Sequence, residues 1–215
     1  MILCSSAVEP STVNRLVPGS NPGGGVMKIH SYTDPFPYLY IEEFYTQDEL
    51  DLIWKELDFY ASNRENIFIP DLLSAHEDGK LLKSNSGVFL DEMHANNRSA
   101  SHILNFNRKL FEVMQAEDNW FFKNLYCNHD TTLLSYYCDS DYYAPHYDKS
   151  VCTACTWLHK DPITYVGGEF SFTEFDRAFM GNNNCTVIFP GQVKHSVTQV
   201  NGYGRWCISQ FLNHI

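Results

Sequence analysis

The chain has 215 residues, enough for one domain with a substantial core and too few for two. Apolar residues make up 44% of it, and no stretch approaches the roughly 18 uninterrupted apolar residues of a membrane span, so we expect no membrane contact. The formal net charge of −11 argues against a nucleic-acid partner, because binding phosphates requires a surplus of Lys and Arg.

Residues 1–26 are predicted to be a disordered tail or linker. They end in "LVPGSNPGGGV", a composition that cannot bury enough apolar surface to become ordered. The stretch "MILCSSAVEPSTVNRL" is a poor signal peptide, and seven cysteines do not form the dense disulfide framework of a small secreted domain. We therefore expect a cytoplasmic protein in which Met27 opens a single domain, residues 27–215.

The first half of the domain shows helical patterns. After a predicted strand at residues 38–44, Thr46 and Glu49 have the spacing of a capping box, and apolar residues then recur at helical intervals from Leu50. Residues 61–86 show little periodicity and predict a long excursion, a common place for a functional lid. A second helix is predicted over residues 99–117, capped by Ser99 or Ser101.

The second half predicts short strands separated by turn-forming residues. They cover residues 131–137, 143–148, 151–158, 168–173, 185–190, 194–200 and 205–211. Helices followed by many short strands predict an α+β protein whose antiparallel barrel or sandwich carries the site.

Three residues of these strands have the chemistry of a metal centre. His146 and Asp148 are two residues apart, so in a strand their side chains point to the same face. His195 begins a later strand and supplies a second imidazole. Two histidines and one carboxylate are the ligand set of non-haem Fe(II) oxygenases. Arg205 follows ten residues later, and its planar guanidinium suits a carboxylate ligand.

The spacing of these motifs resembles the 2-oxoglutarate- and Fe(II)-dependent dioxygenase superfamily, and specifically its prolyl 4-hydroxylase-like branch. The segment "YCDSDYYAPHYD" is similar to the branch pattern Y-x-x-G-x-x-Y-x-x-H-x-D, "TACTWLH" to T-x-x-x-Y-L-N, "VGGEFSF" to G-G-E-T, and "HSVTQVNGYGRWCISQF" to H-x-V-x-x-V-x-x-G-x-R. The match covers about residues 131–211, and "DPFPYLYIEEFYTQDEL" more loosely. It implies a double-stranded β-helix, a jelly-roll-like, cupin-like barrel with flanking N-terminal helices.

The resemblance also implies roles for individual residues. His146, Asp148 and His195 would bind Fe(II), Arg205 would bind the far carboxylate of 2-oxoglutarate, and Tyr137 or Tyr143 would donate a hydrogen bond to that carboxylate. The implied reaction hydroxylates an aliphatic C–H, first of all in a prolyl or other amino-acid residue of a peptide or in a free amino acid, and releases succinate and CO2. Ascorbate is a further candidate cofactor.

The sequence departs from the branch pattern at several positions, and alternative functions remain. Ser140 replaces the branch glycine, His159 its asparagine, and Cys207 lies on the same strand face as Arg205. Cys152 and Cys155 should face opposite sides of a strand, which argues against a shared metal. His76, His94, His129 and His159 are predicted to lie at the surface. The alternatives are a non-catalytic binding module of the same fold and a dioxygenase for a different small molecule. A DNA-repair relative would need a second arginine at the position of Phe211.

Overall fold

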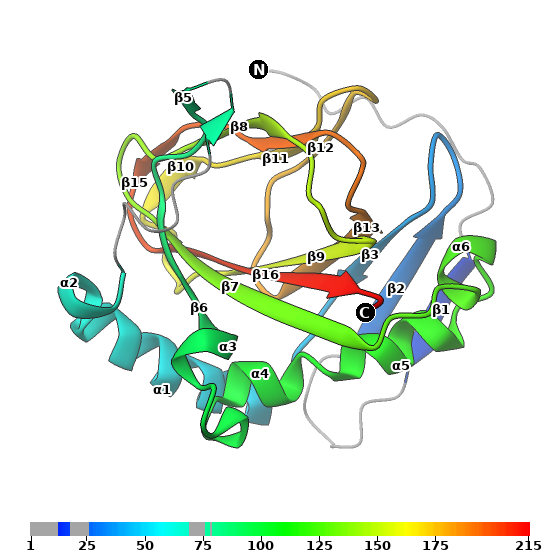
Figure 1. The fold of residues 1–215 in the computed structure, drawn as a ribbon, viewed down its shortest axis with the longest axis horizontal. Helices are drawn as coiled ribbons and strands as arrows, with labels where there is room; N and C mark the ends of the chain where they lie inside the picture. Colours follow the sequence, from blue (N-terminus) through cyan, green and yellow to red (C-terminus); the bar gives the residue numbers. More distant parts are fainter. Residues whose placement is uncertain (1–12, 18–25, 69–75, 78) are drawn as a thin grey trace.

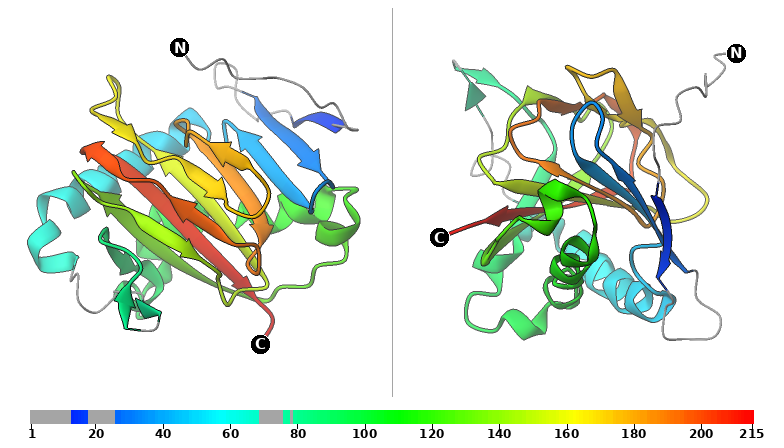
Figure 2. Two further views of the ribbon diagram at one scale, coloured as in Figure 1. Left: turned by 90° about the horizontal axis from the view of Figure 1, so that it is seen from above. Right: turned by 90° about the vertical axis from the view of Figure 1, so that its right-hand side faces the viewer.

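The computed structural model describes residues 13–17, 26–68, 76–77 and 79–215, which form three layers: helices, a large sheet and a smaller sheet (Figure 1). The helices lie against one face of the large sheet, and the smaller sheet covers the other face (Figure 2). The site described below therefore lies between two sheets, on the side away from the helices.

The large sheet has eight strands, and every neighbouring pair in it is antiparallel. In spatial order these are β1 (Val13–Val17), β2 (Met27–Tyr32), β3 (Tyr38–Glu42), β13 (Cys185–Pro190), β9 (Cys152–Leu158), β16 (Arg205–Asn213), β7 (His129–Tyr137) and β6 (Ser86–Phe89). Along the second half of the chain, successive strands of the large sheet are separated by strands of the smaller sheet. Wrapping of this kind gives the double-stranded β-helix that the sequence predicts.

The smaller sheet has four strands, and two further strand pairs accompany it. Its order is β12 (Arg177–Phe179), β11 (Phe170–Phe172), β14 (His195–Val197) and β8 (Tyr143–His146); the separate pairs are β10 (Tyr165–Gly167) with β15 (Val200–Gly202) and β4 (His76–Glu77) with β5 (Lys80–Leu81). All seven strands predicted beyond residue 131 are present, several of them shorter than predicted. The predicted strand at residues 38–44 is β3.

The helical layer begins as the sequence predicts. Thr46 caps α1 (Gln47–Ser62): its hydroxyl accepts from the Glu49 backbone, and the Glu49 carboxylate accepts from the Thr46 backbone in return. The other helices are α2 (Arg64–Ile67), α3 (Leu90–Met93), α4 (His102–Phe106), α5 (Lys109–Ala116), α6 (Trp120–Lys123) and a 3₁₀ turn at Arg98–Ala100.

The prediction of a single helix over residues 99–117 is wrong, because the structure has two helices in this range, α4 and α5. Ser101 rather than Ser99 caps α4. Asn107 stands at the break with its side chain buried, and it accepts a hydrogen bond from the hydroxyl of Tyr45. Asparagine is a weak helix former, and here this contact with a residue distant in the sequence decides its position.

The strands shared by both layers alternate their faces. Along β9, Cys152 and Leu158 pack toward the helices, whereas Cys155 and Trp157 point into the space between the sheets. Along β16, Ile208 packs with the helices and Cys207 faces the interior between the sheets. Cys152 and Cys155 therefore lie on opposite faces of the sheet, as expected.

Two predictions concern segments at the margins. Val13–Val17, within the segment predicted to be a tail, forms strand β1 and pairs with β2. The rest of that segment, apart from residue 26, lies outside the described residues, so the domain boundary stays a prediction. Part of the predicted lid, residues 69–75 and 78, also lies outside them. None of the helices in the described ranges has the length and hydropathy of a bilayer span.

Candidate metal centre

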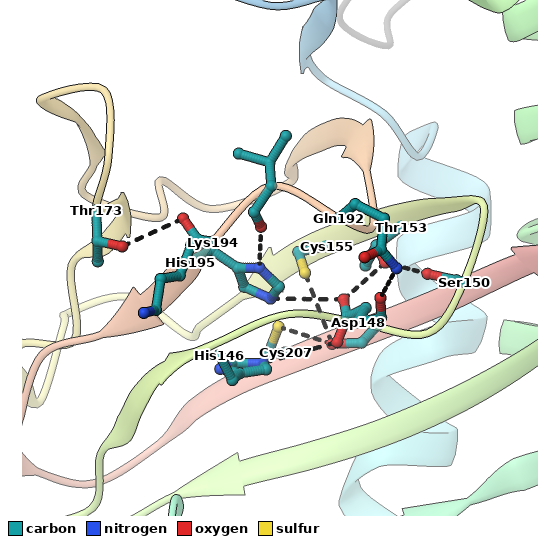
Figure 3. A network of polar contacts seen from close by, with 12 residues as sticks. His146, Asp148, Ser150, Thr153, Cys155, Thr173, Gln192, Lys194, His195 and Cys207 are labelled. Carbon is teal, nitrogen blue, oxygen red and sulfur yellow. Dashed lines mark hydrogen bonds and ion pairs between the residues drawn. The ribbon is translucent and has the colours of Figure 1, made fainter.

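His146, Asp148 and His195 meet between the two sheets. His146 and His195 are paired across β8 and β14, with their ring centroids 4.2 Å apart. The Nε2 atom of His146 lies 3.7 Å from Asp148 Oδ1, and the Nε2 atom of His195 lies 3.5 Å from Asp148 Oδ2 (Figure 3). The three potential ligand atoms lie within 4.8 Å of one another. The structure thus brings together the three residues that the sequence selects.

Backbone carbonyl groups orient both imidazoles. Nδ1 of His146 lies 2.8 Å from the carbonyl oxygen of Ala144, and Nδ1 of His195 lies 2.9 Å from that of Val193. A carbonyl only accepts hydrogen bonds, so each Nδ1 carries the proton and each Nε2 presents a lone pair to the shared point. Burial lowers the pKa of both histidines to about 4, and for His146 the neighbouring His195 adds to the effect. Both rings are therefore neutral near pH 7, the form that binds metals.

Asp148 is held by a chain of polar contacts. The hydroxyl of Thr153 donates to Asp148 Oδ2 at 2.7 Å and also contacts the hydroxyl of Ser150 at 2.7 Å (Figure 3). The backbone of Asp148 donates to Gly191, and Gln192 donates to the Asp148 carbonyl. Burial raises the pKa of Asp148, which the Thr153 hydrogen bond opposes. The sequence alone indicates no role for Thr153, although it is the first residue of "TACTWLH".

The donor set fits Fe(II). Two neutral imidazole nitrogens and one carboxylate, each largely buried, converge on one point, and a set of three protein ligands leaves further coordination positions of the metal for other ligands. The two cysteines nearest this region, Cys155 and Cys207, lie beside Asp148, each with its thiol 3.7 Å from the hydroxyl of Ser209 (Figure 3). They do not belong to the three-residue ligand cluster.

Within the described residues, Arg205 is a buried cation without a counter-charge or hydrogen-bond partner. Its side chain is 0% exposed, and none of its three guanidinium nitrogens has a hydrogen bond. Its guanidinium carbon lies 4.5 Å from the ring centroid of Tyr137, which is directly opposite on β7. A buried charge with no counter-charge is costly, so this site fits an anionic ligand with a carboxylate at its end.

A glycine makes room for the Arg205 side chain. Gly168 has a φ of +73°, and a Cβ atom there would lie 2.8 Å from both Cδ and Nε of Arg205. Gly168 lies between the end of β10 at Gly167 and the start of β11 at Phe170. The close approach of backbone to the Arg205 stem explains why glycine stands at position 168.

The two candidate tyrosines occupy different places. The ring of Tyr143 is stacked on His146, with centroids 3.6 Å apart, whereas Tyr137 lies beside Arg205. Burial raises the pKa of both phenols, so both remain protonated and able to donate near neutral pH. The assignment of a tyrosine donor to 2-oxoglutarate stays a prediction, and the geometry favours Tyr137 because it is the one next to Arg205.

One histidine prediction is wrong. His159 is 6% exposed rather than at the surface, because it follows β9 into the interior and its ring packs near Tyr165. Among the described residues, neither its Nδ1 nor the Nε1 of Trp157, two residues earlier, has a hydrogen-bond partner. His94 is half-buried and its Nε2 lies 3.0 Å from the hydroxyl of Tyr60. His129 is also half-buried, and the side chain of His76 lies outside the described residues.

Comparison with solved structures identifies the fold. No protein-family model and no curated protein sequence matches the chain. Among solved structures, a Pseudomonas putida prolyl-4-hydroxylase aligns with a TM-score of 0.62 at 14% identity, covering 83% of this chain and 93% of that one. The chain has the prolyl 4-hydroxylase fold. The resemblance seen in the sequence is thereby confirmed at the level of the fold.

Two further solved structures agree. A Trichoplax adhaerens prolyl hydroxylase in complex with a hypoxia inducible factor peptide fragment aligns with a TM-score of 0.60 at 12% identity, over 82% of this chain and 83% of that one. A viral collagen prolyl hydroxylase from Paramecium Bursaria Chlorella virus-1, in complex with 2-oxoglutarate, aligns with a TM-score of 0.53 at 12% identity, over 81% and 94%.

Proposed function

We propose that the chain is a 2-oxoglutarate- and Fe(II)-dependent dioxygenase that hydroxylates an aliphatic C–H. The observation that carries this proposal is the coexistence, in one barrel interior, of the His146–Asp148–His195 cluster and the unpartnered guanidinium of Arg205. The cluster matches the ligand preferences of Fe(II), and the arginine matches a diacid that also reaches the metal. A site for a metal alone would not require a second, buried cation.

Each residue has a defined task in this proposal. His146, Asp148 and His195 would hold the metal on one face. Arg205 would fix the far carboxylate of 2-oxoglutarate through two parallel hydrogen bonds, and the Tyr137 hydroxyl would donate to the same carboxylate. When bound, the iron and 2-oxoglutarate supply the oxidising power for C–H hydroxylation, with succinate and CO2 as co-products. The aromatic walls exclude water from the space between the sheets.

The first substrate candidate is a prolyl or other amino-acid residue in a peptide, or the free amino acid. Its support is the fold shared with three prolyl hydroxylases, one of which was solved with a peptide bound. The net charge of −11 leaves a nucleic-acid substrate without electrostatic support. Ascorbate, as a reductant that keeps the iron ferrous, stays part of the proposal.

The test is anaerobic reconstitution with Fe(II) and 2-oxoglutarate, followed by admission of air and measurement of succinate. We expect succinate from the wild-type chain and stimulation by proline-containing peptides. Arg205→Ala should lose most of this activity, because the charged pair with the far carboxylate is lost and the Tyr137 hydroxyl is only a neutral donor. Tight metal binding without any succinate would overturn the proposal in favour of a non-catalytic binding module of this fold.

A further inference from the structure

A short segment before β6 pairs with the start of β8. Lys83 is paired with Tyr143 in an isolated antiparallel bridge, with Ala144 donating to the carbonyl of Leu82 and Ser84 donating to that of Tyr142. In this pattern Lys83 and Tyr143 form a non-hydrogen-bonded pair, whose side chains lie close together on the same face. The Lys83 side chain therefore lies on the same face as the side chain of Tyr143, whose ring is stacked on the metal-centre residue His146.

Lys83 is a buried cation with no counter-charge. The residue is 6% exposed, and within the described part of the chain its ammonium makes neither a hydrogen bond nor an ion pair. Burial alone lowers its pKa from 10.5 to about 8. Long basic side chains are almost never this buried without a partner. Lys83 is still protonated for the most part near neutral pH, so an anion is what this position lacks.

The ammonium lies next to the metal centre. Its Nζ is 5.7 Å from the ring centroid of Tyr143, and that ring is stacked on His146 at 3.6 Å. A ligand group bound by Lys83 would therefore lie one aromatic ring away from a metal ligand.

The charges of the proposed holoenzyme are already balanced without Lys83. Fe(II) and Arg205 together carry three positive charges, and Asp148 with the two carboxylates of 2-oxoglutarate carries three negative charges. Histidines that ligate a metal are neutral and add no charge. The charge of Lys83 is then left over at a largely buried residue, where an uncompensated ion is costly. A substrate that brings one carboxylate would neutralise it.

We propose that Lys83 binds a carboxylate of the substrate, so that the hydroxylated molecule is acidic close to the reacting C–H. This inference rests on the proposed function and names its substrate class. Asn85 supports the assignment, since it is 5% exposed and its Oδ1 has no donor. The β6–β7 ladder pairs Ser86 with Tyr136, so its extension by one residue sets Asn85 opposite Tyr137. Asn85 Oδ1 would accept an N–H of the same substrate.

The carboxylate can come from two sources, and matched acid and amide pairs separate them. Free L-proline against L-prolinamide tests an α-carboxylate, and blocked Glu-Pro against Gln-Pro peptides tests an acidic side chain. Affinity would be measured calorimetrically under anaerobic conditions, on the chain loaded with Fe(II) and 2-oxoglutarate. We expect at least one acid to bind about tenfold or more tightly than its amide. Equal affinities in both pairs would overturn the proposal.

Substitution of Lys83 decides whether this preference arises there. Lys83→Met keeps the apolar stem and should abolish the preference for the acid, whereas Lys83→Arg should retain part of it. Lys123→Met, on an exposed lysine of α6, makes the same change in net charge and should leave the preference intact. Persistence of the preference in Lys83→Met would contradict the assignment. A lower affinity of Lys83→Met for 2-oxoglutarate would also contradict the assignment, because it would show that Lys83 binds the co-substrate rather than the substrate.

Two readouts keep this test separate from that of the proposed function. Calorimetric binding requires no turnover, so an absence of succinate would overturn the dioxygenase proposal while the acid preference was still measured. The ligand-free melting temperature gives the second readout. Lys83→Met should raise it, because an uncompensated buried charge is removed. A lower melting temperature together with an unchanged acid preference would identify Lys83 as a structural residue only.

Discussion

The same strands present two different chemistries on their two faces. Toward the helices, the large sheet presents mainly aliphatic side chains, for example Leu134 and Ile208. Between the sheets, the interior is lined by aromatic rings and also holds Arg205, with three guanidinium nitrogens that have no partner. Two of the sheet's central strands, β9 and β16, contribute to both faces.

This difference indicates that one face of the strands mainly stabilises the fold and the other mainly binds ligands. The helix-facing side buries apolar surface, which stabilises the fold but offers few polar groups to bind a ligand. The interior keeps costly, unpartnered polar groups that only a bound metal and anions would satisfy. Of two neighbouring residues in one strand, we therefore expect substitution of the interior-facing one to weaken ligand binding and substitution of the helix-facing one to lower the free energy of unfolding. The following substitutions test that separation.

The largest effect is expected at the metal ligands. His146→Ala should weaken Fe(II) binding by more than about 100-fold, beyond what loss of an outer-shell partner costs, and should abolish succinate formation. Calorimetric metal titration and circular dichroism would be measured together. Metal binding that survives this change would mean that the cluster is not the binding site, and loss of the fold would mean that the interior also carries stability.

The converse is expected on the helix-facing side. Leu134 is 0% exposed in the cluster that faces the helices, and Leu134→Ala should cost about 2–5 kcal/mol of unfolding free energy. Thermal and urea unfolding would measure this loss. The affinity for Fe(II), measured well below the melting temperature, should not change. A parallel fall in metal affinity would show that the two faces are energetically coupled.

A pair of threonines on β9 gives a matched comparison. Thr153 faces the interior and donates to Asp148, whereas Thr156 faces the helices and shares a hydrogen bond with Thr186. Thr153→Val should weaken metal binding about tenfold, as for other partners of ligating carboxylates. Thr156→Val should lower stability by about 1 kcal/mol and leave metal affinity unchanged. Equal metal affinities in the two variants would contradict the separation.

The smallest effect is a pH dependence caused by Lys83. Its pKa is lowered from 10.5 to about 8 in the folded chain, so between these values the unfolded state binds more protons and folding stability rises with pH. At neutral pH the ligand-free Lys83→Met variant should be the more stable. Its advantage should shrink by on the order of 1 kcal/mol as pH rises from 8 to 10, measured by urea unfolding. A constant difference would show that Lys83 is not desolvated.

Local sequence patterns predicted the parts of the molecule that depend on local chemistry. The Thr46 capping box, the alternation along β9 and the metal cluster all follow from spacing within a strand or helix turn, or from motifs in order. The break at Asn107 depends on Tyr45, and the environment of Lys83 depends on Tyr143, sixty residues later. The burial of His159 likewise depends on how β9 continues between the sheets. Such contacts join distant segments and leave no local pattern in the sequence.

The central claim is that the metal cluster and Arg205 form one site for Fe(II) and 2-oxoglutarate. The most direct measurement is the affinity for 2-oxoglutarate, determined calorimetrically without oxygen, in the wild type with and without Fe(II) and in Arg205→Ala with Fe(II). We predict tight binding only in the wild type with Fe(II), and losses of about tenfold or more when either the metal or the guanidinium is absent. An affinity that depends on neither would contradict the claim.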